Sequence, residues 1–129
     1  MAGSDLEVVG QGYAAFAAGD LAALSELFAE DATWTVPGSG PTSGTKQGRD
    51  AVMAYLVEVM TRSEGTFKVT QLALAEGGGH VFALDQSEAT RNGVSLNSSG
   101  VNVFQLKDGR VQSVQQYFEN TDESDAFWA

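Results

Sequence analysis

The amino-acid sequence predicts an α+β domain in which a curved antiparallel sheet wraps as a cone around three N-terminal helices. Apolar residues recur at helical spacing through the first half of the chain, and from residue 65 onward the pattern alternates with a period of two. Glycine-containing turn signals at 77–79, 92–93 and 108–109 divide the second half into strands. A chain of 129 residues with 43 % hydrophobic content supports one core, so we expect residues 1–129 to form a single domain.

The first half of the sequence contains three segments with helical periodicity. The first covers residues 5–18 and ends at Gly19, which favours helix termination. The second is a short helix capped by Asp20, and the third covers residues 49–61. Their apolar stripes are Leu6, Val9, Tyr13 and Phe16, then Leu21, Leu24, Leu27 and Phe28, then Val52, Tyr55, Leu56, Val59 and Met60.

Strand signals begin between the second and third helices. Residues 33–36 are β-formers ended by Pro37, and the polar segment at 37–48 predicts a loop that lies over the mouth of the cone. After the third helix, strands are expected at 67–74, 81–90, 94–106 and 110–120, with Asn92-Gly93 favouring a type I′ hairpin. The tail carries Phe127 and Trp128, which we expect to fold back onto the body.

Composition excludes several classes of function. Seventeen acidic and seven basic residues give a formal charge of -10, which disfavours nucleic acid and anionic membrane surfaces as partners. The chain has no cysteine and one histidine, so thiolate chemistry and multi-histidine metal sites are excluded. No apolar run approaches the length of a membrane span, and no leader pattern is evident. We therefore expect a cytoplasmic protein without a metal or an organic cofactor.

The main candidate for chemistry is Asp85, which interrupts an apolar run within the expected strand at 81–90. Strand alternation places Asp85 on the same face as Val81, Ala83 and Ser87. If that face lines the hollow of the cone, burial raises the pKa of Asp85 and allows acid or base chemistry near neutrality. The alternative is a half-exposed strand end, at which Asp85 is solvated or pairs with a nearby Lys or Arg.

Six further residues are candidates for substrate binding in the same hollow. Amide side chains on neighbouring strands can orient a substrate carbonyl or hold Asp85 in place, and aromatic side chains can stack and donate a hydrogen bond. Surface amides and plain core aromatics are the corresponding structural alternatives. The candidates are Tyr13, Trp34, Tyr55, Asn102, Gln116 and Asn120.

Several motifs, taken in order, resemble the nuclear transport factor 2-like superfamily and in particular its SnoaL-like branch. They are LFAEDATW at the second helix-to-strand junction, GRDAV at the start of the third helix and VFQLKDGRV before the last strand, within a match from about Val8 to Trp128. The resemblance implies a cone-shaped α+β barrel and a homodimer formed through the outer face of the sheet. The superfamily includes cyclases, isomerases, epoxide hydrolases, dehydratases and binding modules, so the fold leaves the function open.

Comparison with individual branches narrows the catalytic candidates. The general base of ketosteroid isomerases falls on Val36, and the carboxylate that SnoaL-like cyclases carry at the end of the last strand falls on Asn120. The resemblance to limonene-type epoxide hydrolases places Asp85 on one catalytic Asp, whereas their Arg and second Asp fall on Ala83 and Gln116. One carboxylate of that set therefore remains.

Two functions are consistent with these observations. The first is a cofactor-independent enzyme that uses Asp85 for proton transfer on a small apolar oxygenated molecule, by cyclisation, isomerisation, dehydration or epoxide opening. The second is a small-molecule binding protein of the same fold without chemistry, which the missing Arg and second Asp favour.

Overall fold

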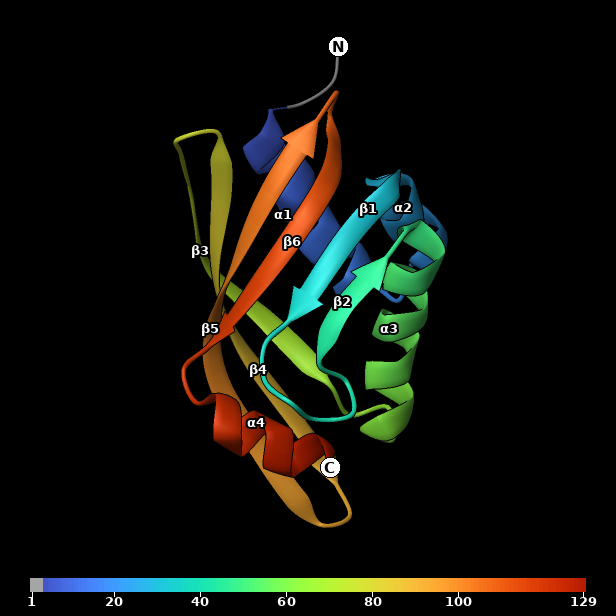
Figure 1. Ribbon diagram of the computed structural model, residues 1–129, viewed down its shortest axis with the longest axis vertical. Helices are drawn as coiled ribbons and strands as arrows, with labels where there is room; N and C mark the ends of the chain where they lie inside the picture. The colour runs from blue at the N-terminus through green and yellow to red at the C-terminus, as the bar shows by residue number, and fades with distance from the viewer. Residues whose placement is uncertain (1–3) are drawn as a thin grey trace.

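The computed structural model describes residues 4–129 and contains four helices and six strands in that range (Figure 1). The first three residues, on which part of the argument about a leader rests, lie outside the described residues. The elements, in order, are α1 (Asp5–Ala17), α2 (Leu21–Glu26), β1 (Phe28–Val36), β2 (Gly44–Gln47), α3 (Arg49–Arg62), β3 (Lys68–Gly77), β4 (His80–Arg91), β5 (Val94–Lys107), β6 (Arg110–Phe118) and α4 (Thr121–Trp128).

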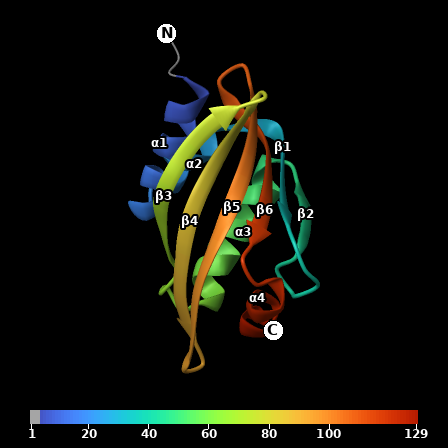
Figure 2. The same ribbon diagram turned by 90° about the vertical axis from the view of Figure 1, so that its left-hand side faces the viewer.

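The six strands form one curved sheet in the order β2-β1-β6-β5-β4-β3. The helices α1, α2 and α3 lie against one face of it, and the long strands β3 to β5 bend along the other side of the molecule (Figure 2). This arrangement confirms the expected α+β class. Every neighbouring pair is antiparallel except β1 and β6, which run parallel.

The parallel pair corrects the prediction of a purely antiparallel sheet. Trp34 of β1 lies opposite Val114 of β6, although about eighty positions separate them in the sequence. The helix α3 and four strands, β2 to β5, lie between β1 and β6 in the chain, so no hairpin constrains their relative direction. The sequence pattern identifies strands locally and carries no signal for this distant pairing.

The boundary between the second helix and the first strand also differs from the prediction. Leu27 is the C-cap of α2, and Phe28 is the first residue of β1. Phe28 is buried, but as part of the sheet and not of the helix stripe. An apolar residue at such a junction fits both the helical and the strand periodicity, so an apolar side chain there does not show which of the two elements contains it.

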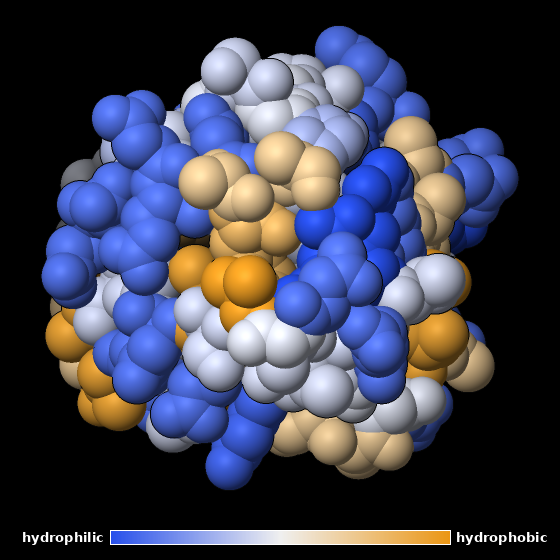
Figure 3. Space-filling view, turned by 90° about the horizontal axis from the view of Figure 1, so that it is seen from below, coloured by the Kyte–Doolittle hydropathy of each residue, from blue (hydrophilic) through white to orange (hydrophobic). Residues whose placement is uncertain are grey.

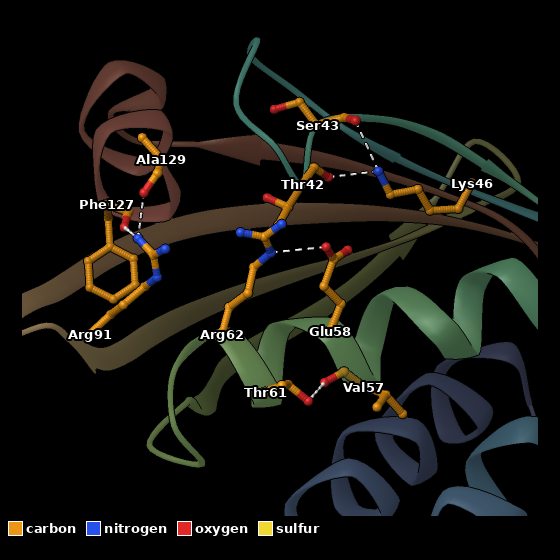
Figure 4. Close-up of polar contacts among 10 residues, drawn as sticks. All are labelled: Thr42, Ser43, Lys46, Val57, Glu58, Thr61, Arg62, Arg91, Phe127 and Ala129. Atoms are coloured by element: carbon orange, nitrogen blue, oxygen red, sulfur yellow. Dashed lines mark hydrogen bonds and ion pairs between the residues drawn. The ribbon is translucent and has the colours of Figure 1, made fainter.

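The segment expected to be a loop over the cone mouth contains β2, which pairs with the end of β1. Its irregular part, residues 37–43, is held against α4, because Asp125 accepts hydrogen bonds from the backbone N–H groups of Ser39 (2.9 Å) and Gly40 (3.2 Å). Lys46 of β2 closes the loop from the other side by donating to the carbonyls at 42 and 43, at 2.7 and 3.0 Å (Figure 4). The loop is therefore fastened to α4.

The hairpin between β4 and β5 confirms the turn prediction. Asn92 has a φ of 52° and Gly93 a φ of 78°, which are the two positive φ angles that a type I′ turn requires. Asp108 and Gly109 repeat the geometry between β5 and β6, with φ angles of 54° and 78°. Both turns match the right-handed twist of the strands that they join.

The C-terminal tail folds back as expected, but it does so as a helix, α4, that the sequence analysis did not predict. Phe127 and Trp128 of α4 are buried in the main core. Arg91 at the end of β4 donates from Nη1 to the carbonyl oxygens of Phe127 (3.1 Å) and Ala129 (2.6 Å) (Figure 4). Seen from the α4 end, the surface is mostly hydrophilic, with small apolar areas between polar side chains (Figure 3).

Replacing Arg91 with Ala is expected to lower the free energy of unfolding by about 1 to 2 kcal/mol, because two carbonyls at the end of α4 lose a charged donor. Urea denaturation measures the change. Arg110→Ala, which removes the same charge from an exposed side chain, serves as the control and is expected to have little effect. An equal loss in both variants would show that net charge, and not the bond to α4, is responsible.

Candidate functional site

Strand β4 presents Asp85 to the inside of the cone. Val81, Ala83 and Asp85 alternate along the buried face, and Asp85 is only 6 % exposed. Phe82 and Leu84 point to the outer face of the sheet and are exposed. Val81, Ala83 and Asp85 therefore share one face, as alternation predicted, and the structure shows that this face is the inner one.

Asp85 is held by a closed set of three hydrogen bonds. Tyr13 on α1 donates its hydroxyl to Asp85 Oδ2 at 2.8 Å, and Asn102 Nδ2 on β5 donates to the same oxygen at 3.2 Å. Asn102 Nδ2 also lies 2.9 Å from the Tyr13 hydroxyl oxygen, which accepts from it. Within residues 4–129 no side chain or backbone group bonds to Asp85 Oδ1, so one oxygen is fixed and the other is free.

The surroundings raise the pKa values of both titratable groups in this set, Asp85 and Tyr13. Burial raises the pKa of Asp85 from 3.8 to about 6, although the hydrogen bond from Tyr13 acts to lower it. Burial, together with the adjacent Asp85 carboxylate, raises the pKa of Tyr13 well above its usual value. Tyr13 therefore remains a protonated donor while Asp85 exchanges its proton near neutral pH.

Asp85 borders a cavity of about 90 Å³ between the sheet and the helices, which we call the larger cavity. Aromatic side chains surround it: Tyr13 packs edge-on against Phe104, and the rings of Trp34 and Tyr55 lie 5.8 Å apart. Its other apolar wall residues include Val9, Phe16, Leu24, Phe28, Leu56 and Val111. This is a concave apolar space with few polar groups, as small-molecule sites commonly are.

Two polar groups in the wall complete the larger cavity. Tyr55 donates its hydroxyl to Gln116 Oε1 at 3.2 Å, which leaves the Gln116 amide nitrogen without a partner among residues 4–129. Trp34 Nε1 is buried and has no acceptor in the same part of the chain. A buried donor without an acceptor is uncommon in proteins and is a reason to consider a polar ligand atom nearby.

A second cavity of about 40 Å³, the smaller cavity, adjoins the first. Seven residues belong to both walls: Tyr55, Val59, Phe67, Asp85, Ser87, Asn102 and Gln116. The smaller cavity is completed by Ser98, Ser99, Gly100, Phe118, Ser124 and Trp128. Asp85 therefore stands at the junction of an apolar space and a more polar one.

Six of the seven residues predicted from the sequence lie around the larger cavity, and Asn120 does not. The six are Asp85, Tyr13, Trp34, Tyr55, Asn102 and Gln116. Asn120 is exposed and forms the N-cap of α4, where its side chain accepts from the backbone N–H of Glu123 at 3.0 Å. The expectation that Asn120 contributes to substrate binding in the cone is thus corrected, because a helix cap occupies its side chain.

Ser124, which belongs to the wall of the smaller cavity, was not predicted as a site residue, because α4 was not expected. The cap itself was readable, since Asn120 followed three positions later by Glu123 is a pattern typical of a helix start. No metal-binding group is evident in the described part of the chain, where no three His, Cys, Asp or Glu side chains come together. In residues 4–129 no helix has the length and apolar character needed to cross a membrane.

Comparison with known proteins places this geometry in a family. The family model described as a SnoaL-like domain matches residues 9–114. The uncharacterized protein Rv0034 of Mycobacterium tuberculosis (strain H37Rv) is 32 % identical over 127 residues, which cover 98 % of this chain and 97 % of that protein.

Solved structures agree with the family match. The chain is 34 % identical to Bal32a, from a soil-derived mobile gene cassette, with 97 % and 96 % of the two chains covered and a TM-score of 0.94. It is 26 % identical to a nuclear transport factor 2-like protein of unknown function from Burkholderia pseudomallei, with 97 % of each chain covered and a TM-score of 0.82. This chain therefore belongs to the SnoaL-like domain family and has the nuclear transport factor 2-like fold.

Proposed function

We propose that the protein is a cofactor-independent enzyme that uses Asp85 to transfer a proton on a small apolar oxygenated molecule bound in the larger cavity. One observation supports this more than any other. The Asp85 carboxylate is buried at the edge of an apolar cavity, with Oδ2 held by Tyr13 and Asn102 and Oδ1 without a partner in residues 4–129. A positioned carboxylate with one free oxygen is the arrangement that general acid–base catalysis needs.

The two oxygens of Asp85 have separate roles in this proposal. Tyr13 and Asn102 are positioning residues that fix Oδ2, while Oδ1 accepts a proton from a carbon or hydroxyl group of the substrate. The protonated carboxyl then returns the proton to another substrate atom, so the enzyme ends in its starting state. A pKa of about 6 keeps the base form dominant at neutral pH while the acid form stays accessible.

Cyclisation, isomerisation and dehydration all fit a single residue that first removes and then donates a proton. Cyclisation and isomerisation follow from proton removal next to a carbonyl, and dehydration from proton donation to a departing hydroxyl. Epoxide opening also fits, with Asp85 protonating the ring oxygen or activating a water. The apolar and aromatic wall favours a substrate with a hydrocarbon ring or chain.

A carbon-acid probe tests the proposal without knowledge of the natural substrate. The protein is incubated with 2-tetralone in D₂O, and loss of the α-proton signal is followed by NMR. We expect exchange faster than in buffer alone, with a rate that rises with pH through about 6 as Asp85 ionises. Exchange at the buffer rate across this pH range would contradict proton abstraction by Asp85.

A binding protein without catalysis is the second candidate. The observation that favours it is the set of side chains near Asp85, since buried Ala83 on the same strand face and Gln116 in the cavity wall provide neither a cation nor a second carboxylate. Prolonged incubation with the compound that co-purifies with the protein separates the two candidates. Recovery of that compound chemically unchanged supports binding alone, whereas a modified product supports the enzyme.

We further propose that the partner of this chain is a second copy, bound through the outer face of the sheet. Leu84, Val101 and Tyr117 are cross-strand neighbours on that face, and Phe82 and Val103 form the adjacent pair. Leu84 is 42 % exposed and Tyr117 56 % exposed. An apolar row of this kind on a sheet is typical of a surface that associates.

Replacing Leu84 with Lys is expected to convert a dimer to a monomer at micromolar concentration, because two copies would bring the added charges into an apolar contact. Light scattering measures the mass of both proteins. Val57→Lys on the exposed side of α3 is the matched control and is expected to leave the dimer intact. A monomeric unmodified protein would contradict the proposal.

A further inference from the structure

We propose that the smaller cavity is a subsite for an uncharged hydroxyl or carbonyl group of the ligand, and that Ser124 is the residue that recognises this group. The inference rests on the proposed function, because it assigns the ligand's apolar body to the larger cavity. It adds a chemical class, namely a neutral molecule with an apolar body and a polar end. The reacting atom then lies at the junction, beside Asp85.

A glycine forms part of the wall of the smaller cavity beside Asp85. Gly100 on β5 lies directly opposite Asp85 on β4, and both belong to the wall. A Cβ atom built at Gly100 would meet the Tyr117 carbonyl oxygen at 2.7 Å, so the strands approach too closely there for any other residue. Glycine is therefore required at this point of the wall.

Ser124 contributes a hydroxyl group that is enclosed but not satisfied. Its side chain is 5 % exposed, and within residues 4–129 its Oγ has no hydrogen-bond partner. The Oγ atom keeps some accessible surface, and Ser124 belongs to the wall of the smaller cavity. A buried hydroxyl that faces an open space is available for a ligand atom.

Ser87 and Ser98 add hydroxyl groups to the same space from the sheet. They are cross-strand partners on β4 and β5, and both belong to the wall of the smaller cavity. Ser87 Oγ has no partner among the described residues, and Ser98 Oγ makes one long bond, 3.4 Å, to the Ser99 carbonyl. Serine residues from α4, β4 and β5 therefore border one small volume.

The charges around the two cavities indicate that the polar end is neutral. Neither wall contains a Lys, Arg or His side chain, and Asp85 is the one acidic residue in both. A carboxylate or phosphate would meet no cation and would be repelled by Asp85 once this residue ionises. Hydroxyl groups both donate and accept, which suits an alcohol or a carbonyl oxygen.

Three probes that share a phenylbutyl body test the subsite by calorimetric titration of the full chain at pH 7.5. They are 4-phenylbutan-1-ol, butylbenzene, which lacks the hydroxyl, and 4-phenylbutanoic acid. We expect the alcohol to bind the unmodified protein about fivefold more tightly than butylbenzene, and the acid to bind more weakly than the alcohol, since one neutral buried hydrogen bond is worth roughly this factor. A fourth probe, 4-phenylbutylamine, tests whether Asp85 instead selects a cation.

Ser124→Ala is expected to remove the fivefold advantage of the alcohol while leaving the affinity for butylbenzene unchanged. Ser124→Thr, which keeps a hydroxyl, is expected to restore part of the advantage. Ser113→Ala on β6, which lies outside both walls, is the matched control. The butylbenzene affinity separates recognition from a structural defect, because a damaged cavity would weaken every probe.

The possible failures can be distinguished. Equal affinity for the alcohol and butylbenzene would overturn the subsite while leaving a ligand site in the larger cavity. Tighter binding of the amine or the acid than of the alcohol would overturn the neutral class. Absence of binding by all four probes would count against both the subsite and the proposed function.

Discussion

Asp85→Asn is expected to reduce the exchange of 2-tetralone at least about a hundredfold, to the rate in buffer. A positioned general base contributes typically about 10² to 10⁴ in rate, and an amide cannot accept a proton in this pH range. The substitution keeps the size of the side chain, and its amide oxygen can still accept from Tyr13. The loss should therefore fall on the chemical step and not on the binding of the probe.

Two controls make this result specific. Asp108→Asn in the turn between β5 and β6 changes the same functional group far from the cavities, and it should leave the exchange rate unchanged. Tyr13→Phe removes the hydrogen bond that lowers the pKa of Asp85 against the effect of burial. The pKa of Asp85 should therefore rise further, and the increase in exchange rate should occur at a higher pH. If the Asp85→Asn variant still exchanged the α-protons of 2-tetralone at the unmodified rate, a group other than Asp85 would be the base.

Ionisation of Asp85 is expected to lower the free energy of unfolding of the protein at neutral pH. The folded protein holds the Asp85 proton more tightly than the unfolded chain, because its pKa is raised from 3.8 to about 6. The stabilising contribution of the protonated carboxyl is therefore complete below about pH 4 and is lost as the pH rises through about 6. This pKa shift corresponds to a change of about 2 to 3 kcal/mol in the free energy of unfolding. The lower figure applies if water in the cavity solvates the ionised carboxylate.

Urea denaturation of the unmodified protein and Asp85→Asn at pH 4 and pH 7.5 measures this difference. The variant does not titrate at this position, so its stability relative to the unmodified protein should increase by about 2 to 3 kcal/mol between the two pH values. The other acidic residues remain in both proteins and cancel in the comparison. A difference that is independent of pH would mean that Asp85 has an ordinary pKa in the folded state.

Local patterns predicted most of the fold and the orientation of the site. Alternation in residues 81–90 placed Val81, Ala83 and Asp85 on one face of β4, and helical spacing placed Tyr13 and Tyr55 on faces that meet the sheet. The Asn92-Gly93 turn fixed the hairpin between β4 and β5, and therefore brought Asn102 within reach of Asp85. These features depend on residues close together in the sequence or on a register that a short turn defines.

The features that the sequence analysis missed depend on distant contacts or on weak local signals. The parallel pairing of β1 and β6 joins segments about eighty positions apart, and β2 is a short polar edge strand. The helix α4 has only eight residues, too few for a repeated apolar pattern, so the role of Asn120 as a cap and the position of Ser124 in a cavity wall were not predicted. Neither cavity was measurable from the sequence, because cavities depend on how side chains from all elements fill the interior.

The hydrogen bonds around Asp85 join the first helix to the middle of the sheet, across sequence separations of 72 and 89 positions. The acidity of this one carboxyl group consequently reports whether α1 is docked. If α1 swings away, water reaches Asp85 and its pKa falls toward 3.8, even while the strands remain paired. A titration of the Asp85 carboxyl ¹³C resonance would therefore show, in any variant of this protein, whether α1 is docked on the sheet.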